Sequence, residues 1–269
     1  MSEGAPVLEL EKVSKSFGPV QALQDVDFEV RPGEVVALVG DNGAGKSTLV
    51  KAIAGIHSID DGQVLFEGSP VKITAPPDAV KLGIATVYQD LALCDNLDVV
   101  ENLFLGREKR GGGLAGVTRQ LDETSMEREA HSLLENLAVT ITDVRKEVGT
   151  MSGGQRQQVA IARSLLGDPK VVMLDEPTAA LGVRQTAQVL ALIKRLRENG
   201  HGVIVVSHNL ADVFEVADRI VVLRLGRLAG IYDAKQTSRE EVVGAITGAS
   251  DPNTGDLGPP VDAESGDAR

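Results

Sequence analysis

The residues best suited to chemistry form a glycine-rich loop that ends in a lysine and a serine. Segment 40–47 reads GDNGAGKS and matches G-x-x-x-x-G-K-[ST] at each fixed position. An apolar run precedes it and an amphipathic run follows, so the loop should join a buried strand at 34–39 to a helix at 46–54. Such a loop wraps its N–H groups around a phosphate, and the helix dipole favours the negative charge. The residues assigned to this phosphate-binding loop are Gly40, Asp41, Asn42, Gly43, Ala44, Gly45, Lys46, Ser47 and Thr48.

Two carboxylates stand in succession at the end of another apolar run. Asp175 and Glu176 follow the run 171–174, so their side chains should leave the carboxyl end of a buried strand in opposite directions. In open α/β sheets this is the edge where ligands bind. Asp175 and the Ser47 hydroxyl are assigned to magnesium. Glu176 is assigned to polarising an attacking water, and Lys46 to neutralising the terminal phosphates.

A third segment, M-S-G-G-Q at 151–155, opens an amphipathic helical run. Ser152 is a natural N-cap, and each glycine in the first turn of a helix costs about 1 kcal/mol relative to alanine. Some group must therefore come close to the backbone there. An anionic phosphate fits the serine hydroxyl, the free N–H groups and the helix dipole. The residues assigned to it are Ser152, Gly153, Gly154 and Gln155.

Composition excludes several classes of protein. The chain has 269 residues, 42% of them hydrophobic, which is enough to bury a core. The formal charge of −12 argues against a general affinity for nucleic acid, which requires a basic face. No run of eighteen apolar residues occurs, and residues 1–6 lack the features of a secretory signal. The single cysteine, Cys94, excludes an internal disulfide and fits a reducing compartment.

The order of apolar patterns predicts an α/β fold. Alternation at 7–13 and 22–30, continued at 62–66, predicts an antiparallel β layer near the N-terminus. Short β-branched runs, separated by helical stretches, predict a mainly parallel sheet in a P-loop NTPase core. These runs lie at 34–39, 84–88, 171–175 and 203–207.

Helical patterns at 97–105 and 122–137 predict a helical subdomain inserted into this core, at about residues 90–165. The glycine-rich stretch 111–116 between them is expected to be a loop. Ser238 and Glu241 form a capping-box pattern that should open a last short helix. We therefore predict a single domain over residues 1–247, followed by a disordered acidic tail at 248–269.

These segments together resemble the ATP-binding cassette ATPases of membrane transporters, over roughly residues 7–247. The S-G-G-Q segment precedes Asp175 at the family's order and approximate spacing. The resemblance implies that Gln89 is the Q-loop glutamine, with a role in catalysis and at the metal, and that His208 is the switch histidine at the γ-phosphate. It implies that Phe17 stacks on adenine and that the cofactors are ATP and Mg²⁺. It also implies a homodimer in which the signature of one copy completes the ATP site of the other.

Two features stand outside this pattern. The family usually has an aspartate where this chain has Gly182, so contacts across the dimer should be arranged differently. Of the four histidines, His57, His131 and His201 fall in no motif and are expected to be ordinary surface or loop residues.

Segment 88–108 resembles that of bacterial importers of monosaccharides of the ribose, xylose and fructose kind. The resemblance implies a peripheral subunit at the cytoplasmic face of the cell membrane, bound to separate permease subunits. A periplasmic or extracellular sugar-binding protein would act with them indirectly, and no nucleic acid is involved. Three alternatives stay open at this point. They are an importer of a non-sugar solute, a soluble cassette ATPase of an assembly machine, and a P-loop kinase, although a kinase would have no use for Ser152–Gln155.

Overall fold

The apolar runs of the sequence lie side by side in one six-stranded sheet. The computed structural model of the chain describes residues 4–111 and 121–249. Strand order in the sheet is β10-β9-β3-β8-β7-β6, and all neighbours run parallel except the β9–β10 hairpin. The strands are β3 (Val35–Val39), β6 (Ile84–Val87), β7 (Val171–Asp175), β8 (Gly202–Val206), β9 (Arg219–Arg224) and β10 (Arg227–Asp233). The predicted mainly parallel sheet is confirmed, with strand ends within a residue or so of those expected.

Both faces of this sheet are buried, as the continuous apolar runs require. Val36 and Leu38 of β3 face one hydrophobic core, which they share with the antiparallel sheet and the helix that follows the glycine-rich loop. Val35, Ala37 and Val39 face a second core on the side of the longer helices. Successive side chains of a strand alternate between faces, so one short strand can serve both cores.

The N-terminal strands form the predicted antiparallel layer, in the order β2-β1-β4-β5. They are β1 (Leu8–Phe17), β2 (Val20–Val30), β4 (Asp61–Phe66) and β5 (Ser69–Val71). Leu8 and Leu10 are buried in the core shared with helix α1 (Lys46–Ile53), whereas Glu9 and Glu11 lie on the opposite face. Both β1 and β2 extend beyond the alternating segments, into a hairpin that ends at Phe17 and Val20.

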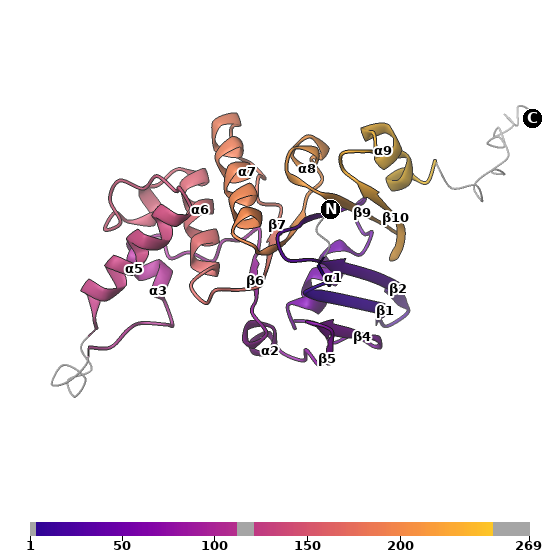
Figure 1. Ribbon diagram of the computed structural model, residues 1–269, viewed down its shortest axis with the longest axis horizontal. Helices are drawn as coiled ribbons and strands as arrows, with labels where there is room; N and C mark the ends of the chain where they lie inside the picture. The colour runs from indigo at the N-terminus through magenta and orange to yellow at the C-terminus, as the bar shows by residue number, and fades with distance from the viewer. Residues whose placement is uncertain (1–3, 112–120, 250–269) are drawn as a thin grey trace, which may run out of the picture.

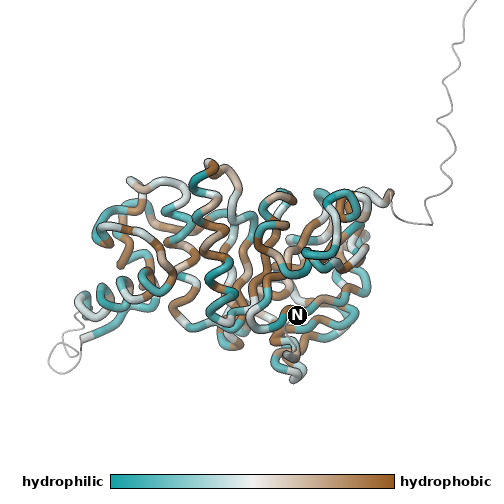
Figure 2. Tube along the Cα trace, turned by 45° about the horizontal axis from the view of Figure 1, so that its top comes forward, coloured by the Kyte–Doolittle hydropathy of each residue, from teal (hydrophilic) through white to brown (hydrophobic). Residues whose placement is uncertain are grey.

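Helices cover the sheet and form a separate group beyond strand β6 (Figure 1). Helices α3, α5 and α6 form that group, which agrees with the predicted helical insertion, and Figure 2 shows the apolar stretches concentrated in the middle of the molecule. No helix in the described ranges is both long and apolar enough to cross a membrane. Residues 112–116 of the glycine-rich stretch, and the predicted tail from 250 onward, lie outside those ranges. The helices are α1 (Lys46–Ile53), α2 (Pro76–Lys81), α3 (Val99–Phe104), α5 (Glu123–Asn136), α6 (Gly153–Ser164), α7 (Val183–Glu198), α8 (Leu210–Val216) and α9 (Arg239–Thr247).

Candidate active site

Four parallel strands bring the predicted site residues to one edge of the sheet. Strands β3, β8, β7 and β6 are consecutive neighbours, and their carboxyl ends point the same way. Gly40 follows β3, His208 follows β8 by one residue, and Glu176 follows Asp175 at the end of β7. Gln89 lies just beyond β6. The fold therefore places a phosphate-binding loop beside two carboxylates and an imidazole.

Two positions of the glycine-rich loop require glycine, because a Cβ there would collide with a backbone carbonyl oxygen. Gly40 has φ 152°, and a Cβ there would lie 2.2 Å from the carbonyl oxygen of Leu223. Gly45 has φ 104°, and its Cβ would lie 2.7 Å from the carbonyl oxygen of Ala22. Gly45 is also the N-cap of α1, and no side chain caps this helix. The first N–H groups of α1 can therefore bind an anion.

The Lys46 side chain folds back onto the start of this loop. Its ammonium donates hydrogen bonds to the carbonyl oxygens of Gly40, at 2.7 Å, and Asp41, at 2.9 Å. Burial lowers the pKa of Lys46, while Glu176, Asp41 and Asp175 act in the opposite direction. A lysine that is partly desolvated and close to these acidic residues is well placed to exchange carbonyl partners for phosphate oxygens.

Asp175 is a partly buried carboxylate, and its burial costs free energy. Burial raises its pKa, and the neighbouring Glu176 raises it further, while Lys51 and Lys46 partly offset the effect. Buried carboxylates usually bind metals or pair with cations. Together with a serine hydroxyl, such a group forms the hard oxygen donor set that Mg²⁺ prefers.

Glu176 and His208 form a pair at the edge of the site. The Nδ1 atom of His208 lies 2.8 Å from Oε2 of Glu176. The Glu176 side chain is 17% exposed, whereas that of His208 is 75% exposed. Glu176 also has φ 50°, an uncommon backbone conformation outside glycine that often accompanies function. The strained turn therefore presents the carboxylate to the imidazole and to the solvent in front of the loop.

Gln89 and Phe17 come from different parts of the fold, Gln89 from just beyond β6 and Phe17 from the end of β1. Gln89 is exposed, and its neighbour Tyr88 has a pKa raised mainly by burial and also by Asp175. Phe17 closes the β1–β2 hairpin with 44% of its surface exposed. The same hairpin touches the phosphate-binding loop where Ala22 approaches Gly45.

The predicted signature segment does not join the other site residues. Ser152 caps helix α6, its hydroxyl accepting from the Gln155 N–H while the Gln155 side chain accepts from the Ser152 N–H. Helix α6 lies in the helical group, away from α1 (Figure 1). Gly154 instead approaches α7, since a Cβ there would lie 2.8 Å from Cβ of Gln185.

The sequence interpretation missed two positions that brace the turn after Glu176. The Gln185 side chain accepts a hydrogen bond from the Gly182 N–H at 3.1 Å. Gln185 therefore caps Gly182, the position at which the family usually has an aspartate. Thr178 donates to a carboxylate oxygen of Asp212 at 2.6 Å, which ties this turn to α8. Capping-box spacing from 182 to 185 could have indicated the first contact. No local pattern indicates the second.

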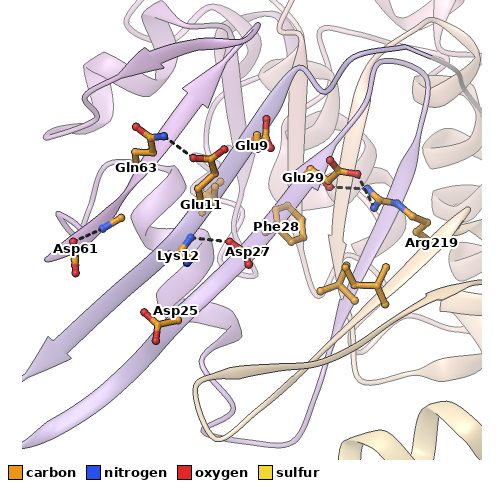
Figure 3. A pocket seen from close by; sticks show the side chains of 14 residues that line it. Glu9, Glu11, Lys12, Asp25, Asp27, Phe28, Glu29, Asp61, Gln63 and Arg219 are labelled. Carbon is orange, nitrogen blue, oxygen red and sulfur yellow. Dashed lines mark hydrogen bonds and ion pairs between the residues drawn. The ribbon is translucent and has the colours of Figure 1, made fainter.

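A cavity of about 770 Å³ lies on the other face of the antiparallel sheet from α1. Carboxylates from β1, β2 and β4 line much of it, and Figure 3 shows several of them bonded to protein groups. Lys12 donates its N–H to Asp27, Gln63 donates to Glu11, and Arg219 donates to Glu29. The cavity faces away from the phosphate-binding loop, and its negative charge is unsuited to a nucleotide. The candidate site is therefore the strand edge, where the His208 side chain is largely exposed.

Comparison with known proteins identifies the family of this chain. The family model for the ABC transporter matches residues 23–179. The chain belongs to the ABC transporter family. It is 45% identical to the fructose import ATP-binding protein of Rhizobium meliloti, over 92% of this cassette and 96% of that protein. Identity to the xylose/arabinose import ATP-binding protein of Sulfolobus acidocaldarius is also 45%, over 90% and 94%. The ribose import ATP-binding protein of Rubrobacter xylanophilus is 43% identical, but the cassette spans only 48% of it.

Solved cassettes share the fold. The ADP conformation of MJ1267, an ATP-binding cassette of an ABC transporter, superposes with a TM-score of 0.77 at 27% identity, covering 93% of this chain and 97% of that one. A dimeric post-hydrolysis structure of the cassette MJ0796, bound to ADP and Pi, gives 0.69 at 25% identity, covering 86% and 100%. The predicted α/β cassette fold and the ATPase activity are confirmed.

Proposed function

We propose that this cassette hydrolyses ATP to energise the import of a sugar, a monosaccharide in particular, through separate permease subunits. The observation that carries the proposal is the similarity to the fructose import protein along nearly its whole length. The xylose/arabinose and ribose relatives support the same class of cargo. Specificity for one sugar would reside in the permease and in a sugar-binding protein outside the cell, since an ATPase subunit does not touch the cargo.

In the proposed site, the phosphate chain of ATP lies along the loop Gly40–Thr48. The loop N–H groups and the Lys46 ammonium neutralise its charge, which is the main catalytic task in phosphoryl transfer. Ser47, Asp175 and Gln89 would hold Mg²⁺, which neutralises phosphate charge when bound. The raised pKa of Asp175 fits this role, because a divalent cation would relieve the cost of a buried carboxylate.

Glu176 is the proposed general base that takes a proton from the attacking water. His208 lies within hydrogen-bonding distance of it and is exposed, so the imidazole can orient the carboxylate and reach towards a γ-phosphate. Gln89, at the end of β6, would report nucleotide state to the permease.

A second copy of the chain is the proposed source of the rest of the site. The segment Ser152–Gln155 carries the donors of a helix N-terminus, yet it lies apart from the loop of its own chain. The dimeric cassette structure among the solved relatives supports closure of two copies over nucleotide. Peripheral attachment at the cytoplasmic face of the cell membrane follows from the proposed permease contact.

Replacing the proposed base tests the catalytic assignment. Glu176→Gln should lower kcat by about 10²–10⁴-fold, the contribution typical of a positioned base, while Mg·ATP binding is retained. Phosphate release and equilibrium nucleotide binding measure the two quantities separately. The control is Glu198→Gln, at the exposed end of α7. Parental turnover in Glu176→Gln would contradict the assignment.

The cargo is tested in vesicles that hold the cassette with its permease and binding protein. ATP hydrolysis should rise with fructose, ribose or xylose, and should not rise with a disaccharide. Stimulation by a non-sugar solute alone would overturn the sugar assignment and leave the ATPase assignment intact.

A further inference from the structure

Phe17 is held in a small cluster that the sequence did not reveal. Its ring lies 5.0 Å from the His57 ring, centroid to centroid, at an interplanar angle of 72°. The Lys15 ammonium lies 5.5 Å from the centroid of the same Phe17 ring. Edge-to-face aromatic pairs and cation–π contacts are both favourable in these geometries. His57 lies in the loop after α1, as expected, and its contact with Phe17 is one that the sequence did not indicate.

Main-chain hydrogen bonds tie His57 to helix α1. The N–H groups of Ile56 and His57 donate to the carbonyl oxygen of Lys51, in the last turn of α1. Helix α1 starts at the phosphate-binding loop, so one short helix sets the separation between the loop and the His57 ring. The position of the His57 imidazole relative to the loop is therefore fixed, and its contact with Phe17 can orient the Phe17 ring relative to the phosphates.

Asp60 holds the strand that carries Phe17. Its carboxylate accepts hydrogen bonds from the Lys15 ammonium at 2.6 Å and from the Ser16 N–H at 2.7 Å, and these bonds lower its pKa. The Asp60 N–H donates to the carbonyl oxygen of Ser14. Only 12% of the Lys15 side chain is exposed, so the lysine is held beside the ring. Contacts with His57 and Lys15 thus restrict the Phe17 ring, while 44% of the residue stays open to solvent.

We propose that His57 is a positioning residue for the nucleobase of ATP, acting through Phe17. The inference rests on the stacking of adenine on Phe17, which the resemblance to ATP-binding cassettes implies. An exposed aromatic side chain that is free to rotate loses conformational freedom when a base stacks on it. A ring already oriented by its edge-to-face partner loses less, so the contribution of His57 appears in the affinity for nucleotides that carry a base.

The test compares a ligand with a base and a ligand without one. Binding of Mg·ADP and of Mg·pyrophosphate is measured by calorimetry for the parent, His57→Ala, Phe17→Ala and the double variant. His57→Ala should weaken ADP binding about three- to tenfold, the range expected for loss of one aromatic pair. Pyrophosphate binding should change less than twofold. In the Phe17→Ala background, His57→Ala should have no further effect on ADP binding, since the residue it orients is gone.

Further variants separate positioning from a structural role. His57→Phe should keep ADP affinity close to that of the parent, because it preserves an aromatic edge, whereas His57→Gln should behave like His57→Ala. His131→Ala, on the exposed face of α5, is the matched control and should change nothing. In steady-state hydrolysis, His57→Ala should raise KM for ATP and leave kcat unchanged.

Three results would overturn the proposal. They are an equal loss of ADP and pyrophosphate binding, an additive effect in the double variant, and unchanged ADP binding in both His57→Ala and His57→Gln. Parental ADP affinity in Phe17→Ala would instead refute the stacking assignment on which the inference rests. The ATPase assignment would survive that result if hydrolysis and pyrophosphate binding persisted.

Discussion

At the scale of single residues, burial of the Asp175 carboxylate in the site costs free energy. This carboxylate is partly buried beside Glu176, and both facts raise its pKa. The ordinary solution for a buried acid is a cation partner, and the strand edge offers it Lys46 and a proposed metal. The residues that make hydrolysis possible are therefore expected to destabilise the chain when nucleotide is absent.

Asp175→Asn should accordingly stabilise the protein without nucleotide at neutral pH. A pKa raised in the folded state favours the protonated form, so folding is relatively most stable below the ordinary pKa of 3.8 and loses that advantage as pH rises through the raised pKa. The substitution removes this loss. We expect an increase in Tm that shrinks as pH falls towards 3.8.

Unfolding by heat and by urea across this pH range measures the effect. Glu135→Gln, on the exposed face of α5, is the control and should show no such pH dependence. A lower Tm for Asp175→Asn at neutral pH would contradict the account of Asp175 as a strained carboxylate.

At the scale of elements, helix α6 packs so closely on α7 that one glycine is required. A Cβ on Gly154 would meet Cβ and Cγ of Gln185 at 2.8 and 2.9 Å, atoms that lie near the backbone and cannot move easily. On Gly153 the nearest atom would be a terminal methyl of Leu181 at 3.3 Å. Gly154→Ala should therefore cost about 1–3 kcal/mol, the typical penalty of overpacking. Gly153→Ala should be close to neutral, since alanine favours the helix. Urea denaturation of the two variants compares them directly, and equal stabilities would refute the packing argument.

A second prediction at this scale concerns the ion pairs that join the two sheets. Arg219, at the start of β9, donates to Glu34 beside β3 at 2.6 Å and to Glu29 of β2 at 3.0 Å. Glu34 is only 5% exposed. Arg219→Ala should lower the free energy of unfolding by about 3–5 kcal/mol, because it removes the cation that pairs with the buried Glu34 carboxylate. Adding Glu34→Gln should recover part of this loss in urea denaturation. No recovery would show that the charge of Glu34 is not the cause.

At the scale of the whole molecule, the exposed His208 side chain of the site and the distant signature both favour a dimer that closes on ATP. Glu176→Gln with Mg·ATP should double in mass by light scattering, since bound ATP is not consumed. Each copy carries a formal charge of −12, so moderate salt should strengthen the dimer by screening repulsion. Gly153→Asp in the same background should abolish the dimer by placing a carboxylate where phosphate would dock.

In the parental chain, specific ATPase activity should rise with protein concentration. Activity independent of concentration in a monomer would refute the shared site.

The sequence alone predicted the local parts of this molecule. The phosphate-binding loop, the strand that ends in Asp175 and the cap at Ser152 depend on residues close together in the chain, where periodicity, glycine spacing and capping act. The antiparallel layer followed from alternation, although β1 and β2 run further into their hairpin than the pattern indicated.

Only the tertiary structure decided which of these parts meet. Strand β9 lies beside β3, and β10 is the edge strand beside β9. No periodicity could indicate this order, because a period reveals which face of a strand is buried and not which strand lies next to it. The pairing of His208 with Glu176 depends on the adjacency of β7 and β8. The contact between His57 and Phe17 requires α1 to return the chain to the end of β1. Such contacts join segments far apart in the chain, and their geometry is set by how the sheets and helices pack together.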